Sequence, residues 1–358
     1  MIVSRTPFRI SFFGGGTDYP AWYRQHGGAV LATTINKYCY LTCRYLPPFF
    51  EHRIRVVYSK IENCQTPEEI QHPSARETLC FLKMARGVEI HHDGDLPGRS
   101  GMGSSSAFTV GLLNALYALQ GRVVGKRRLA EESIHIEQER IHEMVGSQDQ
   151  ICAAYGGLNR ISFFANGEFS VQPMTLTQER MEELNAHLML FYTGIKRTAA
   201  TVATSFVPSL AQRTALLNRM REFVDQGCDI LNGGGDLLPF GDLLHQAWQA
   251  KCELSDKISN GTVDAAYQAA RNAGARGGKL LGAGGGGFLL CFAPPSRHAA
   301  IKQELNKLIH VPFKFEFGGS QVIFYDLEED FSAHDQARNG REVPTFRELE
   351  ADAPGAES

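Results

Sequence analysis

The sequence predicts an α+β protein of two domains. Its 358 residues exceed the length of an average domain and can bury a sizeable core. Runs rich in β-branched and aromatic residues dominate up to residue 58, whereas long helical patterns dominate after residue 198. A sheet that is built before the main helices arrive favours an α+β plan over a repeating βαβ plan. We expect a first domain over residues 1–195, a second over 196–330 and a polar tail over 331–358.

Composition argues against several classes of protein. Hydrophobic residues make up 43% of the chain and charged residues 21%, and the formal net charge is −3. This charge offers no basic surplus for a nucleic acid, and the sequence has no run of about 18 apolar residues to cross a membrane. Eight scattered cysteines form no C-x-x-C pair, and the first residues contain no apolar signal core. We therefore expect a cytoplasmic protein with reduced thiols and with no nucleic-acid or membrane partner.

The first elements can be assigned in chain order. Residues 2–13 alternate and then run apolar, as in a strand, and lead into Gly14-Gly15-Gly16-Thr17-Asp18. A triple glycine directly after a strand indicates either backbone pressed close to another group or a tight turn. Further strands are expected over 29–46, 54–58 and 88–92, and a helix over 67–86.

A loop rich in glycine and serine follows these elements. It runs from Asp95 to Ala107 and precedes a buried helix pattern over residues 108–119. Glycines let several backbone N–H groups point into one concavity, and the helix adds the positive end of its dipole, which suits the phosphates of a nucleotide. Three consecutive hydroxyls could cap the helix and offer an oxygen to Mg²⁺, namely Ser104, Ser105 and Ser106. The alternative is a glycine-rich turn with an ordinary helix cap.

A helix is expected over residues 126–145, and one of its faces carries an unusual charge. Spacings of four and three place five residues on one stripe, of which four are apolar and the fifth is Glu137; the apolar members are Ala130, Ile134, Ile141 and Met144. A carboxylate on a core-facing stripe needs a cation, a metal or strong donors, because its desolvation is costly. Glu137 is therefore either a metal ligand or the partner of a structural arginine.

A second acid lies shortly after this helix. Asp149 stands between Gln148 and Gln150, after a glycine and before an apolar run. This is an unusual place for a surface charge, so Asp149 is a candidate general base or charge-stabilising carboxylate. The alternative is the cap of a following helix.

The rest of the chain contains a hairpin, a short buried strand and then mostly helices. The hairpin is expected over 158–175 and the strand over 188–192, followed by Thr193-Gly194-Ile195-Lys196-Arg197. Helices are expected over 198–232, 241–257, 262–273 and 297–309, and strands over 288–292 and 313–327. Gly282, Gly284 and Gly287 satisfy G-x-G-x-x-G, but a strand pattern follows them where a dinucleotide site needs a helix. We therefore expect no Rossmann fold, and the sequence contains no P-loop motif.

Three glycine-rich stretches, in this order and with these neighbours, resemble the motifs of the GHMP kinases. The nucleotide loop of that superfamily is similar to the segment containing Pro97, Gly101, Met102 and the three serines, with Met102 in place of Leu and Ser106 in place of Ala. The first motif resembles residues 6–18 and the third resembles residues 279–288, so the resemblance covers about 1–330. It implies a first domain like domain 2 of ribosomal protein S5, a ferredoxin-like second domain and an active site between them.

The resemblance also implies roles for individual residues. Asp149 matches the catalytic acid, which removes the acceptor's proton or steadies charge, and Arg9 matches a basic residue beside it. Ser105 and Glu137 match the Mg²⁺ ligands. The ATP-binding residues would be Pro97, Gly98, Ser100, Gly101, Met102, Gly103, Ser104, Ser105 and Ser106.

Within the superfamily, four short motifs look most like one branch; they lie at residues 14–18, 146–150, 155–159 and 192–197. Enzymes of that branch phosphorylate the anomeric hydroxyl of D-glycero-α-D-manno-heptose 7-phosphate, a step in nucleotide-activated heptose biosynthesis. The kinases for L-fucose share part of the pattern. Lys196 and Arg197 could hold the 7-phosphate, or they are two solvated cations. The other expected substrate residues are Thr17, Asp18, Gly157, Gly284 and Gly285. A non-catalytic sensor of sugar and nucleotide on the same fold is the alternative outside enzymes, and the protein is expected to be a monomer or homodimer.

Overall fold

The computed structural model describes residues 1–47, 50–196 and 202–326. Within these residues the strands form two sheets. The larger sheet is built around two long antiparallel strands, β1 (Ile2–Phe13) and β2 (Gly28–Tyr45), which pair Arg9 with Thr34. The register of this pair shifts between Pro7 and Phe8, as expected next to a proline, which has no N–H to donate to its neighbour.

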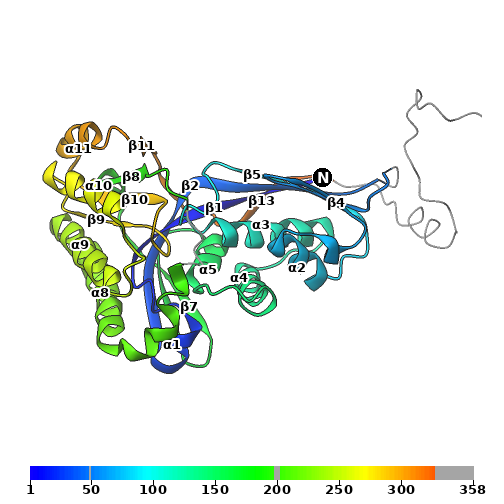
Figure 1. Ribbon diagram of the computed structural model, residues 1–358, viewed down its shortest axis with the longest axis horizontal. Coiled ribbons are helices and arrows are strands. Elements are labelled where there is room, and N and C mark those ends of the chain that lie inside the picture. The colour runs from blue at the N-terminus through cyan, green and yellow to red at the C-terminus, as the bar shows by residue number, and fades with distance from the viewer. Residues whose placement is uncertain (48–49, 197–201, 327–358) are drawn as a thin grey trace, which may run out of the picture.

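The order of the larger sheet is β13-β1-β2-β5-β3-β4; β6 and β12 also pair with β2, and β7 pairs with β6. Its other strands are β3 (Ile54–Val57), β4 (Ile61–Cys64), β5 (Val88–Gly94), β6 (Asn159–Phe163), β7 (Phe169–Pro173), β12 (Phe315–Glu316) and β13 (Gln321–Tyr325). The accompanying helices are α1 (Pro20–His26), α2 (Pro73–Phe81), α3 (Ser104–Leu119), α4 (Lys126–His135), α5 (Gln148–Tyr155) and α6 (Gln178–Ala186). Helices α2 to α5 lie on one side of this sheet, with α3 against β1 and β2 (Figure 1).

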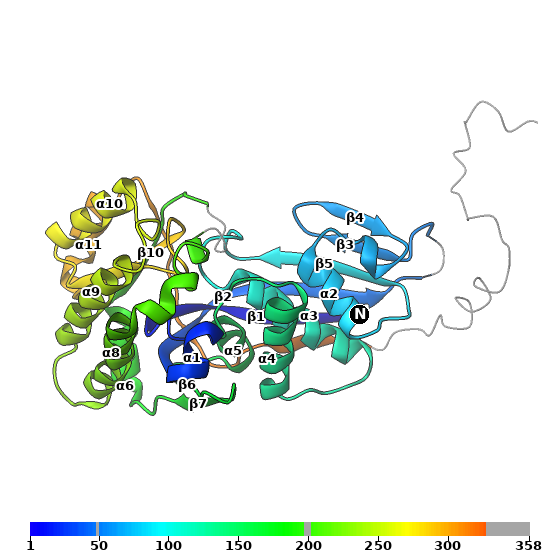
Figure 2. The same cartoon turned by 60° about the horizontal axis from the view of Figure 1, so that its bottom comes forward.

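The smaller sheet has the order β11-β8-β10-β9. It contains β8 (Leu188–Tyr192), β9 (Gly277–Leu280), β10 (Phe288–Phe292) and β11 (Ile309–His310), and its helices are α8 (Thr214–Asn232), α9 (Leu238–Cys252), α10 (Gly261–Asn272) and α11 (His298–Glu304). Short turns of helix lie at η1 (Pro67–Glu69), η2 (Ile136–Arg140), η3 (Val207–Gln212) and η4 (Pro295–Arg297). Figure 2 shows β3 and β4 at the end of the molecule farthest from α8 to α11.

The end of the described chain returns to the larger sheet. Strand β13 pairs with β1, and β12 pairs with β2 through Phe315 and Ile35. The division into residues 1–195 and 196–330 stays a prediction. The predicted boundary assigns β12 and β13 to the second domain, whereas both strands lie in the larger sheet. The predicted tail over 331–358 lies outside the described residues.

Several predicted elements differ from the structure in their ends. The helix expected over 126–145 ends at Arg140, because its last turn widens to the π-helical segment η2 and the backbone of His142 then takes a φ of +60°. The helix expected over 67–86 is the shorter α2, which begins at Pro73, where the fixed φ of proline suits the first helical position. Strand β4 was not predicted from the sequence.

Candidate active site

Arg9 and Asp149 form an ion pair between β1 and α5. The Nε and Nη2 atoms of Arg9 donate to the two carboxylate oxygens of Asp149, each at 2.7 Å. The third donor, Nη1, binds the carbonyl oxygen of Gly101 at 2.6 Å, so the guanidinium is held from two sides. Burial opposes the charge of Arg9, but the ion pair with Asp149 outweighs it and raises the pKa of the guanidinium. The side chain of Asp149 keeps 25% of its surface exposed, so an acceptor can reach it.

Asp149 lies in the first turn of α5, whose preceding residue is Ser147. It is therefore not the cap of this helix, which was the alternative role considered for it. Asp18 lies behind the same turn, where its Oδ1 accepts from the Gly16 amide at 2.9 Å and its Oδ2 from the Gln148 amide at 3.4 Å. A Cβ atom at Gly146 would overlap the Asp18 carboxylate, which explains the glycine in front of the helix. Burial raises the pKa of Asp18, and these two amides offset the shift only in part.

The loop before α3 leaves a helix terminus open to an anion. Gly101 and Gly103 take φ values of +80° and +75°, which only glycine adopts without strain. Gly103 precedes the first residue of α3, and no side chain caps this end. The expectation that a serine hydroxyl caps α3 is therefore wrong. The first amides of the helix lack intrahelical partners and combine with the helix dipole to make a phosphate site.

The other loop residues show how this turn is held. Ser100 is buried and donates its hydroxyl to the Pro97 carbonyl at 2.6 Å, whereas Pro97 and Gly98 are exposed. Met102 is fully buried, and its carbonyl accepts the amide of Arg9 at 3.1 Å. The loop is thereby fixed to the strand that carries Arg9.

The third glycine-rich stretch packs directly against this loop. A Cβ at Gly101 would lie 2.5 Å from the Leu281 carbonyl oxygen, and one at Gly282 would lie 2.5 Å from the Gly101 Cα. The two backbones can approach this closely only because both residues are glycines. Gly284 and Gly285, expected at the substrate, are instead buried against Ile258, whose carbonyl accepts the Gly285 amide at 2.7 Å. The partly exposed members of this stretch are Gly282 and Ala283.

Glu137 is fully buried within the π-helical turn η2, a kind of irregularity that is frequent at functional sites. Its Oε2 accepts from the Ser106 hydroxyl at 2.9 Å and from the Gln150 amide at 2.5 Å. Its Oε1 has no hydrogen-bond partner among the described residues. Burial is the main cause that raises the pKa of Glu137 to about 8. In the described part of the chain no arginine pairs with it, so the structural-arginine alternative is not supported.

The serine that bonds Glu137 is not Ser105, which the motif implies as a metal ligand, but the residue after it. Ser106, which replaces an alanine of the resembled motif, donates to Glu137, whereas Ser105 is exposed at the first turn of α3. The expected role of Ser105 as a metal ligand stays a prediction. No group of three or more His, Cys, Asp or Glu side chains suited to a metal occurs in the residues that the structure describes.

Two predicted substrate residues do not lie beside Asp149. The hydroxyl of Thr17 is fully buried and lies between the carbonyls of Gly14 and Ala29, at 2.8 and 2.9 Å, so it holds the glycine turn. Gly157 lies beyond the opposite end of α5, where its amide contacts Thr34 at 2.7 Å. Both groups thus have partners within the protein, and their expected contacts to a sugar stay predictions. Lys196 is exposed after β8, and Arg197 lies outside the described residues.

Three further residues of this region were missed by the sequence reasoning. Tyr19 and Gln148 flank Asp18 and Asp149 in the chain, and burial raises the pKa of the Tyr19 phenol above its ordinary range. Lys251 of α9 is buried beside the third glycine stretch. A signal for Lys251 was present, because Leu244, Trp248 and Lys251 follow helical spacings of four and three, the pattern that marked Glu137.

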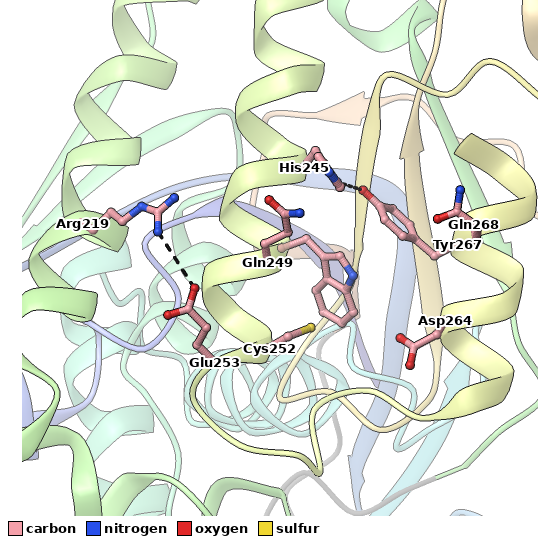
Figure 3. A pocket seen from close by; sticks show the side chains of 9 residues that line it. Arg219, His245, Gln249, Cys252, Glu253, Asp264, Tyr267 and Gln268 are labelled. Atoms are coloured by element: carbon pink, nitrogen blue, oxygen red, sulfur yellow. Dashed lines mark hydrogen bonds and ion pairs between the residues drawn. The ribbon is translucent and has the colours of Figure 1, made fainter. Parts of the chain in front are cut away.

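A cavity of about 630 Å³ lies elsewhere, between α8, α9 and α10 (Figure 3). Figure 3 shows His245 bonded to Tyr267 on one side and Arg219 facing Glu253 on the other. The cavity is lined by Arg219, His245, Trp248, Gln249, Cys252, Glu253, Asp264, Tyr267 and Gln268, none of which is a predicted site residue.

Among the described residues no helix combines the length and apolar character needed to cross a bilayer.

Comparison with known proteins identifies the two halves of this arrangement. The family described as GHMP kinases N terminal domain matches residues 73–157, which include the α3 loop, Glu137 and Asp149. The family described as GHMP kinases C terminal matches residues 220–310, which include Lys251 and the third glycine stretch.

Individual relatives resemble most of the chain. It is 27% identical over 317 residues to the D-glycero-alpha-D-manno-heptose 7-phosphate kinase of Campylobacter jejuni, a match that covers 86% of this chain and 93% of that protein. It is 26% identical over 326 residues to a bifunctional fucokinase/GDP-fucose pyrophosphorylase of Arabidopsis thaliana, covering 84% of this chain and 31% of that protein. The solved structure of a D-glycero-D-manno-heptose 1-phosphate kinase from Bacteroides thetaiotaomicron superposes with a TM-score of 0.75 at 21% identity, covering 92% and 100% of the two chains.

These matches confirm the expected α+β fold of two domains. Both family domains occur in this chain, in the order N-terminal then C-terminal. The first of them contains the helix terminus suited to phosphates and Asp149, the partner of Arg9. The chain belongs to the GHMP kinase superfamily and is an ATP-dependent phosphotransferase that acts on a sugar.

Proposed function

We propose that this kinase transfers the γ-phosphoryl group of ATP to the anomeric hydroxyl of D-glycero-α-D-manno-heptose 7-phosphate. The observation that carries the reaction type is the position of Asp149, which Arg9 ties to the Gly101 carbonyl of the phosphate loop. The choice of sugar rests on the similarity to the Campylobacter jejuni kinase, which extends over 86% of this chain.

In the proposed reaction the open N-terminus of α3 binds the phosphates of ATP. Asp149 accepts a hydrogen bond from the anomeric hydroxyl and takes its proton as the new bond from oxygen to the γ-phosphorus forms. The bond between the γ-phosphorus and its bridging oxygen breaks, and ADP leaves. The Arg9 guanidinium holds the carboxylate in place through two bonds, so little reorganisation is needed at the moment of transfer.

Ser105 and Glu137 are the proposed protein ligands of Mg²⁺. A hydroxyl and a carboxylate are oxygen donors of the type that Mg²⁺ prefers, together with phosphate oxygens. The Oε1 atom of Glu137 is buried without a partner among the described residues, as expected for a group that is completed by a ligand. The ion would neutralise charge on the phosphates of ATP.

Asp18, Tyr19 and Gln148 are the side chains of this region proposed to contact the sugar. Lys196 and Arg197 follow β8, and the Thr193 hydroxyl at the start of the same loop binds the Gly287 carbonyl at 2.9 Å. This contact fixes the start of that loop to the third glycine stretch. The two cations are proposed to hold the 7-phosphate, because arginine and lysine are the usual partners of a phosphate group. L-fucose is the second candidate acceptor, because the similarity to the fucokinase of Arabidopsis thaliana extends over 84% of this chain.

The test of the acceptor is an ADP-release screen with heptose 7-phosphate, unphosphorylated heptose, mannose, L-fucose and galactose. We expect the highest kcat/KM with heptose 7-phosphate, and NMR of the product should show a phosphate at the anomeric oxygen. A higher kcat/KM with L-fucose would replace the proposed acceptor. ADP release with none of these sugars, despite ATP binding, would favour the non-catalytic sensor.

The role of Asp149 is tested with Asp149→Asn. The amide keeps the shape of the carboxylate but cannot take the proton, so we expect kcat to fall by about 10²–10⁴-fold. Equilibrium binding of ATP should stay within about twofold of wild type, because the phosphate site is made by the α3 terminus. Near-normal turnover by this variant would remove Asp149 from its proposed role.

A further inference from the structure

We propose that Lys251 is a positioning residue that holds the third glycine stretch in the form that binds the triphosphate of ATP. This inference rests on the ATP-dependent activity, and it does not depend on which sugar is the acceptor. Lys251 belongs to α9, and its Nζ binds the backbone of the third glycine stretch, which in turn packs against the loop before α3.

The environment of Lys251 is unusual for a lysine. Its side chain is buried, and Nζ donates to the carbonyl oxygens of Leu280, at 3.3 Å, and of Gly282, at shorter range. None of the ion pairs among the described residues includes Lys251. The Trp248 ring is a further partner, with its centroid 5.9 Å from Nζ. Burying an ammonium group with two carbonyls and a ring, but no ion pair, costs free energy that a leucine or methionine would not. The position therefore favours a function in directing those carbonyls over a function in packing.

These contacts determine which way the glycine backbone faces. Because a trans peptide unit is planar, a Gly282 carbonyl aimed at Lys251 turns the following amide, that of Ala283, in the opposite direction. Neighbouring amides are already occupied, since Leu281 donates to Phe288 at 2.9 Å and Gly285 to Ile258 at 2.7 Å. The Ala283 amide makes no hydrogen bond to the described residues. It is partly exposed and free to bind an anion.

The same backbone continues to the reacting groups. Gly282 lies against Gly101, with no room for a Cβ on either residue, and the Gly101 carbonyl accepts Nη1 of Arg9 at 2.6 Å. Arg9 in turn holds Asp149. A shift of Gly282 away from Lys251 would therefore move both the free Ala283 amide and the loop in front of α3.

Lys251 also lies in the electrostatic field of the site. The charged and titratable groups that act on it are Arg9 from β1, Cys252 of its own helix, Asp18, Asp149 and Lys279 from β9. Burial, followed by repulsion from Arg9, lowers the pKa of Lys251 to about 8. Below that pH the ammonium makes charge-assisted bonds to the two carbonyls, and above it the neutral amine binds them more weakly.

The experiment measures the equilibrium affinity for a non-hydrolysable ATP analogue with Mg²⁺, without any acceptor. Lys251→Met removes the donor at similar volume, Lys251→Arg keeps a cationic donor, and Lys257→Met removes an exposed lysine six positions later as the matched control. We expect Kd to rise about tenfold or more for Lys251→Met, to be partly restored in Lys251→Arg, and to stay within twofold for Lys257→Met. The thermal midpoint of Lys251→Met should be equal to wild type or higher, because an apolar isostere avoids the buried charge.

The pH profile distinguishes positioning from a structural role. Between pH 7 and 9.5 the affinity of wild type should weaken more than that of Lys251→Met, because only wild type loses the Lys251 charge. Equal Kd values for wild type and Lys251→Met would overturn the proposal, as would parallel pH profiles. If Lys251→Met fails to fold, a profile for Lys251→Arg identical to that of wild type would overturn it instead, because a guanidinium does not titrate in this range. Failure of every sugar in the acceptor screen would leave these binding results unaffected.

Discussion

At the scale of single residues, Asp18 has a deeply buried carboxyl group that binds the amide of Gln148, the residue before the proposed catalytic Asp149. Its carboxylate accepts the Gly16 and Gln148 amides, and burial raises its pKa above the ordinary value of 3.8. The folded protein therefore keeps a proton that the unfolded chain has already released. It follows that the stability contributed by this group falls as the pH rises from about 3.8 through the folded-state pKa.

Asp18→Asn tests this linkage, because the amide cannot ionise. We expect its urea midpoint to exceed that of wild type at pH 7 and the gap to close at pH 4, where wild type keeps its proton. Activity should move the other way, with kcat/KM for the acceptor reduced about 10–100-fold by the loss of a hydrogen bond to a charged group. The control is Asp225→Asn, an exposed partner of Arg160. A midpoint difference that does not vary with pH would contradict the buried charge.

The residues that sequence reasoning could place are those whose chemistry conflicts with their local pattern. Glu137 was indicated because its charge interrupts an apolar stripe, and Asp149 because it stands after a glycine and before an apolar run. The structure buries Glu137 and brings Arg9 to Asp149. Thr17 and Gly157 were assigned by resemblance alone. The sequence could not show that the Thr17 hydroxyl is occupied by backbone carbonyls, because one of them, that of Ala29, belongs to the neighbouring strand β2.

At the scale of elements, the contact between two glycine loops determines the shape of the proposed nucleotide site. Gly101 has a φ of +80°, and a Cβ there would lie 2.5 Å from the Leu281 carbonyl oxygen. A Cβ at Gly98, three positions earlier in the same loop, would meet nothing within 4 Å. The two glycines therefore offer a matched pair of substitutions.

Gly101→Ala should raise the Kd for ATP about tenfold or more, because strain of roughly 1–3 kcal/mol is relieved only by separating the loops. Gly98→Ala should bind ATP within about twofold of wild type. Both values come from titration with a fluorescent ATP analogue. Equal affinities of the two variants would mean that the contact with Leu281 is not needed for nucleotide binding.

The ends of some elements could not be predicted from the sequence pattern. The helix expected over 126–145 was correct in its first half, because helical periodicity there is regular. It ended early because Glu137 lies in a π-helical turn that carries it to Ser106, a contact across 31 positions in the chain. Local propensity does not encode such a contact. Lys251 shows the reverse case, in which a pattern was present in the sequence and was overlooked.

At the scale of the whole molecule, the two sheets are joined by contacts that sequence spacing does not predict. Nζ of Lys279, from β9 of the smaller sheet, donates to the Phe12 carbonyl of β1 in the larger sheet at 2.8 Å. Strand β13 follows the smaller sheet in the chain and returns to the larger one, where Gln321 pairs with Arg5. The α+β class followed from the order of strand and helix patterns. The return of β12 and β13 did not, because pairing between the two ends of the described chain leaves no local signal.

Phe240 of α9 is the best position for testing whether the two sheets unfold together. It is fully buried, with its ring 5.4 Å from Phe12 and 5.1 Å from Phe13, both of β1, and 5.8 Å from Phe292 of β10. Phe240→Ala should cost about 3–5 kcal/mol of unfolding free energy. Because the ring contacts both sheets, we expect one unfolding transition, shifted to lower urea, in both far-UV circular dichroism and tryptophan fluorescence. Phe164→Ala, at an aromatic side chain that is 48% exposed, should leave the midpoint nearly unchanged. Two separate transitions in Phe240→Ala would instead show that each sheet, with its helices, unfolds independently.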